Sequence, residues 1–299
     1  MPQSRLLLIT ADDFGIGPEV SRGILDLAER GALTSTVLLV NSPFAADAVQ
    51  AWERRGRPIE LGWHPVLTLD RPLSDPATVP SLVGPDGRFQ SLGSLLKRRL
   101  LRRLNPVEIV GEFRLQLRRF VELTGQAPVN VNAHHHVHIF EPVRAALATV
   151  LAEAGIRPYV RAVSESMRTL GCVPGARLKR TILNRFGRKA AKSQTQSGFG
   201  RADAVLGITD PPFVHDHEFF PRWLRQARGR FLELTCHPGH PDDTLVGRDG
   251  TWQDGQLHRR VQEWKLLESP AFRAAIERHG FTPVTADGRP LRSALLRAA

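Results

Sequence analysis

Short apolar runs alternate with longer amphipathic segments along most of the chain, and this alternation predicts repeated strand–helix units. Several of the apolar runs are nearly continuous, as is typical of strands that are buried on both faces. About seven units fit into the 299 residues, which predicts parallel strands in a single sheet or barrel. The predicted strands are Arg5–Thr10, Thr34–Val40, Ile59–Gly62, Val129–Val137, Ile156–Arg161, Ala204–Ile208 and Phe231–Cys236.

Proline near the start and glycine just past the end mark four predicted helices. They extend from Pro18 to Gly31, from Ser42 to Gly56, from Asn105 to Gly125 and from Pro142 to Gly155. Two further helices are expected after Gly255. Nothing in the composition marks a linker, so we expect one domain over residues 1–299, with loop excursions at about 68–90 and 164–197.

Composition narrows the class of protein. A hydrophobic content of 41% excludes a disordered chain, and no apolar run approaches the roughly 20 residues that span a bilayer. The run Leu6–Ile9 is too short for the apolar part of a signal peptide. Cys172 and Cys236 give neither a disulfide framework nor a zinc-ribbon spacing. We therefore expect a cytoplasmic protein without stable membrane insertion.

The formal net charge of +11 points to an acidic partner such as a nucleic acid. The densest basic patch, from Lys97 to Arg103, has no interleaved aromatic residues and no nucleic-acid-binding motif. We interpret it as the solvated face of a helix and expect no nucleic acid partner. The leucines predicted on the other face are Leu95, Leu96, Leu100, Leu101 and Leu104.

Polar side chains recur where the predicted strands end. In parallel β/α folds, ligands bind at the carboxyl ends of the strands, so these side chains define a candidate site. They are Asp12 and Asp13, Asn41, His64, the histidines from His134 to His138, Arg161 and His237.

Two of these groups point to a metal ion. The adjacent carboxylates of Asp12 and Asp13 repel each other unless a cation neutralises them, and a helix cap accounts for only one of them. On a strand, His134, His136 and His138 share one face and His135 lies on the other. Burying three imidazoles is costly unless they bind something. We expect at least one to bind a metal and the others to orient ligands or face the substrate.

Two histidines and a carboxylate make a three-ligand metal set with open positions, which suits Zn²⁺ or a similar transition metal. A second carboxylate beside the metal is what a general base requires, and a histidine across the site can protonate a leaving amine. These residue types therefore indicate metal-assisted hydrolysis of an amide or ester.

The motifs Thr-Ala-Asp12-Asp13-Phe-Gly, Leu-Gly-Trp-His64, Val-Asn-Ala-His134-His-His-Val-His and Glu-Leu-Thr-Cys-His237-Pro-Gly together resemble the YdjC-like carbohydrate deacetylases, which include the ChbG and HpnK types. The resemblance implies a distorted, TIM-like (β/α) barrel and hydrolysis of N-acetyl groups of amino sugars, with homodimers known in the family. It also implies a divalent metal, commonly Mg²⁺, on Asp13, His64 and His134. Asp12 is then the base and His237 the proton donor.

Asn41, His136, His138 and Arg161 are expected to bind substrate or to support the ligands. The acetylated sugar could be an oligosaccharide of the chitin type or a lipid-linked sugar. Two alternatives remain open. One is a Mg²⁺-dependent phosphoesterase or phosphotransferase that uses the Asp pair, although no glycine-rich phosphate loop is present. The other is a basic nucleic-acid-binding protein.

Overall fold

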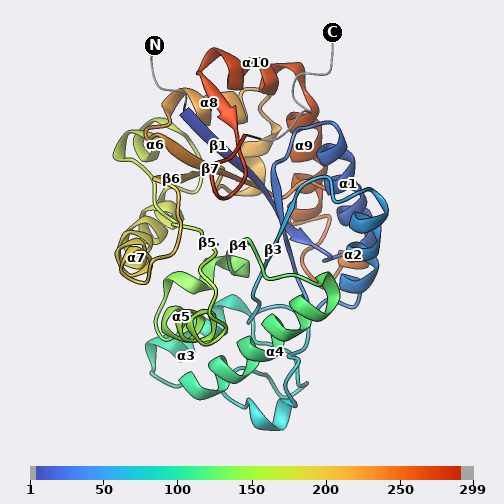
Figure 1. Ribbon diagram of the computed structural model, residues 1–299, viewed down its shortest axis with the longest axis vertical. Helices are drawn as coiled ribbons and strands as arrows, with labels where there is room; N and C mark the ends of the chain where they lie inside the picture. The colour runs from blue at the N-terminus through green and yellow to red at the C-terminus, as the bar shows by residue number, and fades with distance from the viewer. Residues whose placement is uncertain (1–4, 291–299) are drawn as a thin grey trace.

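The computed structural model describes residues 5–290, which form an eight-stranded parallel sheet with helices packed around it (Figure 1). The strand order is β5-β4-β3-β2-β1-β7-β6, and β8 pairs with the first residues of β1. The strands are β1 (Arg5–Phe14), β2 (Ser35–Leu38), β3 (Glu60–Trp63), β4 (Asn130–Val131), β5 (Tyr159–Val160), β6 (Ala204–Leu206), β7 (Phe231–Cys236) and β8 (Phe281–Pro283).

Helices surround the sheet, with α1, α2 and α9 on one side of β1 and α3, α4 and α5 together at one end of the molecule (Figure 1). The α-helices are α1 (Pro18–Glu29), α2 (Ala45–Arg54), α3 (Leu92–Leu100), α4 (Pro106–Thr124), α5 (Val143–Glu153), α6 (Met167–Cys172), α7 (Arg177–Gln196), α8 (Phe219–Gln226), α9 (Gln256–Glu268) and α10 (Pro270–Arg278). The short 3₁₀ helices are η1 (Pro76–Thr78), η2 (His134–Ile139), η3 (Pro211–His215) and η4 (Asp243–Leu245).

The prediction of about seven parallel strands is confirmed, and the arrangement is a half-barrel. Strands β5 and β6 end the main path of the sheet, and within residues 5–290 no ladder joins them. An isolated bridge between Tyr159 and Gly200 and a hydrogen bond from the amide of Val205 to the carbonyl of Ser164 link the two sides of this seam. All paired strands are parallel, so their carboxyl ends lie at one end of the half-barrel.

The helix boundaries follow local chemistry. At the start of α4, the Asn105 side chain accepts a hydrogen bond from the amide of Val107 at 3.0 Å, and Pro106 occupies the first turn. The helix ends at Gly125, whose φ of 69° is left-handed. Its inner face brings Phe113 against Trp63 of β3, with ring centroids 5.8 Å apart. The predicted helices after Gly255 are confirmed as α9 and α10.

The predicted strand Val129–Val137 is wrong beyond its first residues. Only Asn130–Val131 pairs as β4, and the chain then enters η2. His135 and His136 have left-handed φ values of 56° and 57°, so the backbone turns sharply at the histidine run. The two-residue alternation that placed His134, His136 and His138 on one face therefore does not apply.

The excursion predicted at residues 164–197 is helical instead. Helices α6 and α7 fill most of it, and α7 buries Leu183 and Ala190 in a cluster with Phe140 at the end of η2 and Val205 of β6. The same buried face also carries polar Arg180, Asn184 and Gln194, whose presence breaks the apolar periodicity in the sequence. Arg180 is satisfied there by an ion pair with Glu165 and by backbone carbonyls.

The interpretation of the basic patch is correct only in part. It forms α3 and the turn after it, and Leu95 and Leu104 are buried as expected. Leu100 and Leu101, however, are 78% and 49% exposed. Leu100 is the last residue of α3 and Leu101 its C-cap, and Leu95 is the only buried residue of the helix.

The segment 68–90 contains only η1 and a bridge between Val83 and Phe89. The fully buried carboxylate of Glu112 on α4 anchors it by accepting hydrogen bonds from the amides of Leu73 and Ser74. No helix within residues 5–290 is long and apolar enough to cross a membrane.

Two helix glycines give a matched test of how α7 packs. A Cβ on Gly187 of α7 would lie 1.7 Å from the carbonyl oxygen of Val163, whereas a Cβ on Gly111 of α4 would meet no atom of residues 5–290 within 4 Å. We expect Gly187→Ala to lower the free energy of unfolding by about 1–3 kcal/mol through overpacking. Gly111→Ala should raise it by about 0.5–1 kcal/mol, because alanine favours the helix. Urea denaturation followed by circular dichroism measures both, and equal effects would contradict the described packing of α7.

Candidate metal centre and active site

A bulge at the end of β1 brings both aspartates into one site. Ala11 pairs with Thr36 and Phe14 with Leu38, so β1 has one residue more than β2 between these pairs. Asp13 takes a left-handed φ of 67° within this bulge. On a regular strand, adjacent side chains point to opposite faces. The bulge turns Asp13 so that its carboxylate and that of Asp12 both face the carboxyl end of the sheet.

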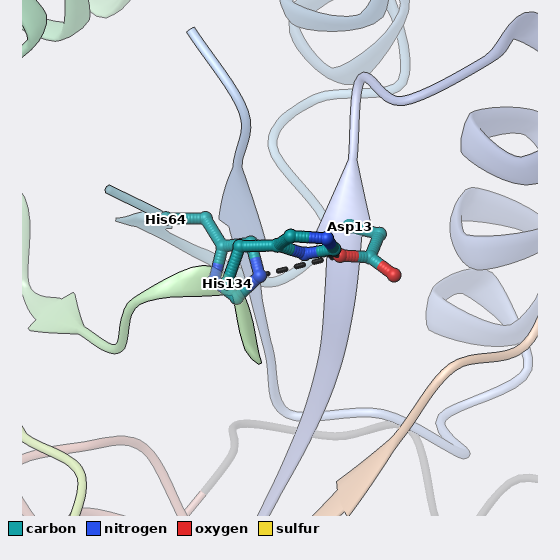
Figure 2. Close-up of side chains that lie close together, drawn as sticks. All are labelled: Asp13, His64 and His134. Carbon is teal, nitrogen blue, oxygen red and sulfur yellow. Dashed lines mark hydrogen bonds and ion pairs between the residues drawn. The ribbon is translucent and has the colours of Figure 1, made fainter. Parts of the chain in front are cut away.

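Asp13, His64 and His134 converge on a single point (Figure 2). Asp13 Oδ1 lies 3.0 Å from His134 Nδ1 and 3.2 Å from His64 Nε2. Figure 2 shows both rings directed toward this carboxylate. His64 directly follows β3, and His134 is the first residue of η2. All three side chains are buried, and one ligand atom from each lies within 4.8 Å of the others.

Hydrogen bonding prepares this group for a cation. His64 Nδ1 lies 2.6 Å from the carbonyl oxygen of Asn132, which can only accept, so Nδ1 carries the proton. In the neutral ring, the lone pair of Nε2 then faces the lone pairs of Asp13 Oδ1. Nδ1 of His134 lies 3.0 Å from the same oxygen. A metal ion bound by Oδ1 and the two rings would replace the repulsion between the facing lone pairs of Oδ1 and His64 Nε2, and one carboxylate with two imidazoles is a common ligand set for a divalent ion.

The charges around the site also favour a divalent cation. Five buried or nearly buried carboxylates and three guanidinium groups form three ion-paired groups around the site, which together carry two more negative than positive charges. The carboxylates belong to Asp12, Asp13, Glu233, Asp249 and Glu263, and the guanidinium groups to Arg161, Arg259 and Arg260. Residual charge in a buried site is costly unless it is neutralised, so a doubly charged ion fits.

Asp12 is held apart from this group by Arg161. The Arg161 guanidinium donates to both carboxylate oxygens, at 2.6 and 2.8 Å, and Thr235 donates to Oδ2 at 3.1 Å. Burial by itself raises the pKa of a carboxyl group, but the charge and hydrogen bonds of Arg161 outweigh it and hold the pKa of Asp12 below its ordinary value. Asp12 is therefore ionised at neutral pH.

Arg161 is itself held in place by Glu233. Its Nε donates to Glu233 of β7 at 2.9 Å, and the hydroxyl of Tyr159 donates to the other oxygen of Glu233 at 2.6 Å. Arg161 and Glu233 are 0% and 1% exposed. In the structure, Arg161 thus orients the carboxylate of Asp12.

Arg260 of α9 orients Asp13 in a similar way. One of its nitrogens donates to Asp13 Oδ2 at 2.7 Å and to Asp249 at 2.6 Å. Asp13 Oδ2 is thereby occupied, and Oδ1 is left for the two histidines. Asp249 Oδ1 also lies 3.9 Å from His134 Nε2.

His237 directly follows β7 and lies beside Asp12. Its Nε2 is 3.8 Å from Asp12 Oδ2, and its side chain is 23% exposed. Burial and then the neighbouring Arg259 lower the pKa of His237 to about 4, against the opposing effect of nearby carboxylates. The ring is therefore neutral at pH 7.

The other residues predicted for the site are His138, His136 and Asn41, and each has different hydrogen-bond partners. Both ring nitrogens of His138 bind backbone groups, the amide of Ala133 and the carbonyl of Arg161, so His138 supports the turn and has no nitrogen left for a metal. His136 is buried beside His138, and its Nδ1 has no hydrogen-bond partner in the part of the chain that the structure describes. Asn41 donates to Glu112 and to the carbonyl of Arg71, and no hydrogen bond in the described chain joins it to the Asp–His group.

Sequence reasoning missed several residues that hold the site. Glu233 had a usable signal, because a carboxylate inside the apolar strand Phe-Leu-Glu-Leu-Thr-Cys must find a buried partner. For Asn132, the only signal in the sequence was its position just before the histidine run. Arg259, Arg260 and Glu263 lie on a helix rich in charged residues, where charges usually face solvent, so nothing in the sequence set them apart.

Comparisons with known proteins agree with this architecture. A family model described as YdjC-like protein matches residues 6–278. A chitooligosaccharide deacetylase of Klebsiella pneumoniae strain 342 is 30% identical over 279 residues, which cover 93% of this chain and 96% of the relative. A second chitooligosaccharide deacetylase, from Klebsiella pneumoniae subsp. pneumoniae strain ATCC 700721, is 29% identical with the same coverage.

Among solved structures, a protein from Enterococcus faecalis V583 that is named for cellobiose-phosphate cleavage has the same fold. The TM-score is 0.78 at 23% identity, and the match covers 95% of this chain and 98% of that one. The family match extends over nearly all of the described residues and includes every residue of the Asp–His group. This chain belongs to the YdjC-like protein family.

Proposed function

We propose that this protein is a metal-dependent hydrolase that removes the N-acetyl group from an acetylated amino sugar and yields acetate and a free amine. The observation that carries the proposal is the pairing of the Asp13, His64 and His134 group with a separate, ionised carboxylate, Asp12, beside it. The relatives named chitooligosaccharide deacetylase support this substrate class. A homodimer, which the family resemblance implies, remains a prediction.

In this proposal, Asp13, His64 and His134 hold one divalent metal ion, Mg²⁺ or a transition metal such as Zn²⁺. Such an ion polarises a carbonyl group and lowers the pKa of water. Asp13 offers Oδ1 because Arg260 occupies Oδ2, and His64 offers Nε2 because Asn132 binds Nδ1. The site residues thus present their ligand atoms before the ion binds.

The other residues act on the substrate and on protons. Asp12 accepts a proton from the attacking water, since it is ionised and Arg161 fixes its orientation. His237 points its Nε2 toward the space beside Asp12, and in place of the proton donation that the family resemblance implies it donates a hydrogen bond to the departing amine nitrogen. No covalent intermediate with the protein is needed. Arg161, His138 and Glu233 hold these groups in place.

The reaction is tested by measuring acetate release. With metal-reconstituted protein, we expect acetate from N,N′-diacetylchitobiose or from a lipid-linked acetylated amino sugar, and the two substrates separate the oligosaccharide from the glycolipid alternative. p-Nitrophenyl phosphate is the control substrate. Phosphate release without acetate release would instead support a phosphoesterase that uses the Asp pair.

Metal binding is tested independently of activity. We expect His64→Ala and His134→Ala to lose most of the metal that the wild type retains after dialysis, because each removes one of three ligands. His217→Ala is the matched control, since that side chain is 86% exposed. Elemental analysis by mass spectrometry gives the metal content. Full retention of metal by His134→Ala overturns the ligand assignment.

The proton-accepting role predicts a variant that binds metal but does not turn over. Asp12→Asn keeps the shape of the side chain and removes its basicity. We expect kcat to fall by about 10²–10⁴-fold, the usual contribution of a general base, with metal content unchanged. Steady-state acetate release and elemental analysis measure the two effects. Wild-type turnover in a metal-loaded Asp12→Asn protein rules out Asp12 as the base.

A further inference from the structure

The surroundings of His237 determine which of its nitrogens carries a proton. Its backbone amide donates to Glu263 on α9, which ties the start of the loop after β7 to that helix. Its Nδ1 lies 3.1 Å from a guanidinium nitrogen of Arg259, also on α9. Its Nε2 faces the substrate side, 3.8 Å from Asp12 Oδ2. The ring is thus held between α9 and β1.

Arg259 cannot turn away from this contact without losing others. Its Nε donates to Glu263 Oε1 at 2.7 Å, and Nη1 donates to the carbonyl oxygen of Thr209 at 3.3 Å. Arg259 is 8% exposed, and Glu263 is fully buried. The remaining nitrogen, Nη2, is therefore directed at His237 Nδ1 by two other bonds.

A guanidinium group only donates hydrogen bonds, so His237 Nδ1 must accept. We propose that Arg259 is a positioning residue that holds His237 as the neutral tautomer with its proton on Nε2, so that His237 meets the departing nitrogen as a hydrogen-bond donor. This inference rests on the proposed deacetylation for its catalytic consequence. The tautomer itself does not depend on any reaction.

Charge and burial support the neutral state. The groups that face His237 are Arg259 and Glu263 from α9 and the carboxylates of Asp12 and Asp13 from β1. Burial and Arg259 outweigh the three carboxylates and lower the pKa of His237 to about 4. Protonation of Nδ1 would also break its bond with Arg259 and place two cations against each other.

The proton that the departing nitrogen receives then comes from the attacking water, by way of Asp12. Water loses a proton to Asp12 as its oxygen forms the new C–O bond. When the C–N bond breaks, its electron pair stays on nitrogen, and that nitrogen takes the proton that Asp12 carried. The Nε2–H of His237 keeps its own proton and stabilises the departing nitrogen by a hydrogen bond.

The tautomer is read directly by ¹⁵N NMR of the metal-loaded protein labelled with [¹⁵N]histidine. The His237 signals are identified as those absent from His237→Gln. We expect a protonated Nε2, an unprotonated Nδ1 and no titration between pH 5.5 and 8. A proton on Nδ1, or a titration in that range, overturns the proposal whether or not acetate is released.

The variant Arg259→Met tests whether Arg259 determines the tautomer of His237. It removes the donor to Nδ1, so the pKa of His237 should rise toward its ordinary value of about 6.5 and a titration should appear in the same spectra. Lys265→Met is the matched control, because it removes a positive charge from the exposed side of the same helix. Unchanged His237 signals in a folded Arg259→Met protein overturn the role of Arg259. If that variant does not fold, the wild-type spectrum still decides the tautomer.

Kinetics separate hydrogen bonding from full proton transfer. Glutamine can donate a hydrogen bond but cannot act as an acid at neutral pH. We therefore expect His237→Gln to turn over about tenfold faster than His237→Ala, the value of one hydrogen bond. Equal losses in both variants contradict the hydrogen-bond role. If the wild type releases no acetate, the proposed function fails while the NMR result stands by itself.

Discussion

The structure of the site depends on one buried guanidinium group. Arg161 lies between the carboxylates of Asp12 and Glu233 with no exposed surface, and it thereby joins the ends of β1, β5 and β7. Without it, two carboxylates would face each other in a dry environment, and leaving such charges unpaired costs about 3–5 kcal/mol. Because Asp12 is fixed by this contact, the bulge beside it is fixed too. The position of Asp13 relative to both histidines follows from that bulge.

A second set of constraints comes from the neighbouring helix α9. Arg260 holds Asp13, and Arg259 holds His237, so adjacent residues of one helix orient groups on opposite sides of the candidate reaction centre. Glu263, one turn further on, is bound to Arg259 and to the backbone of His237. Strand ends supply the reactive groups, whereas α9 limits how each of them can turn. The rigidity of the site is therefore shared between the sheet and one helix outside it.

The sequence predicted the strand–helix rhythm well because burial of a parallel sheet leaves a strong apolar signal. It also predicted which strand ends carry Asp12, Asp13, His64, His134 and His237, and these residues do meet at one end of the sheet. It failed where a local backbone turn replaced a regular element, as at the histidine run. It failed again in α7, where Arg180, Asn184 and Gln194 are buried by pairing with other polar groups rather than by apolarity. Long-range pairing of this kind leaves no periodic trace.

Asp13, His135 and His136 have left-handed backbone angles, which residues other than glycine rarely adopt. Each such residue costs on the order of 1–3 kcal/mol. Aspartate and histidine, however, are among the residue types that tolerate this region best. At Asp13, the geometry of the Asp–His group and the geometry of the backbone thus favour the same residue type. A branched aliphatic side chain at this position would remove the carboxylate from the group and would also strain the bulge of β1.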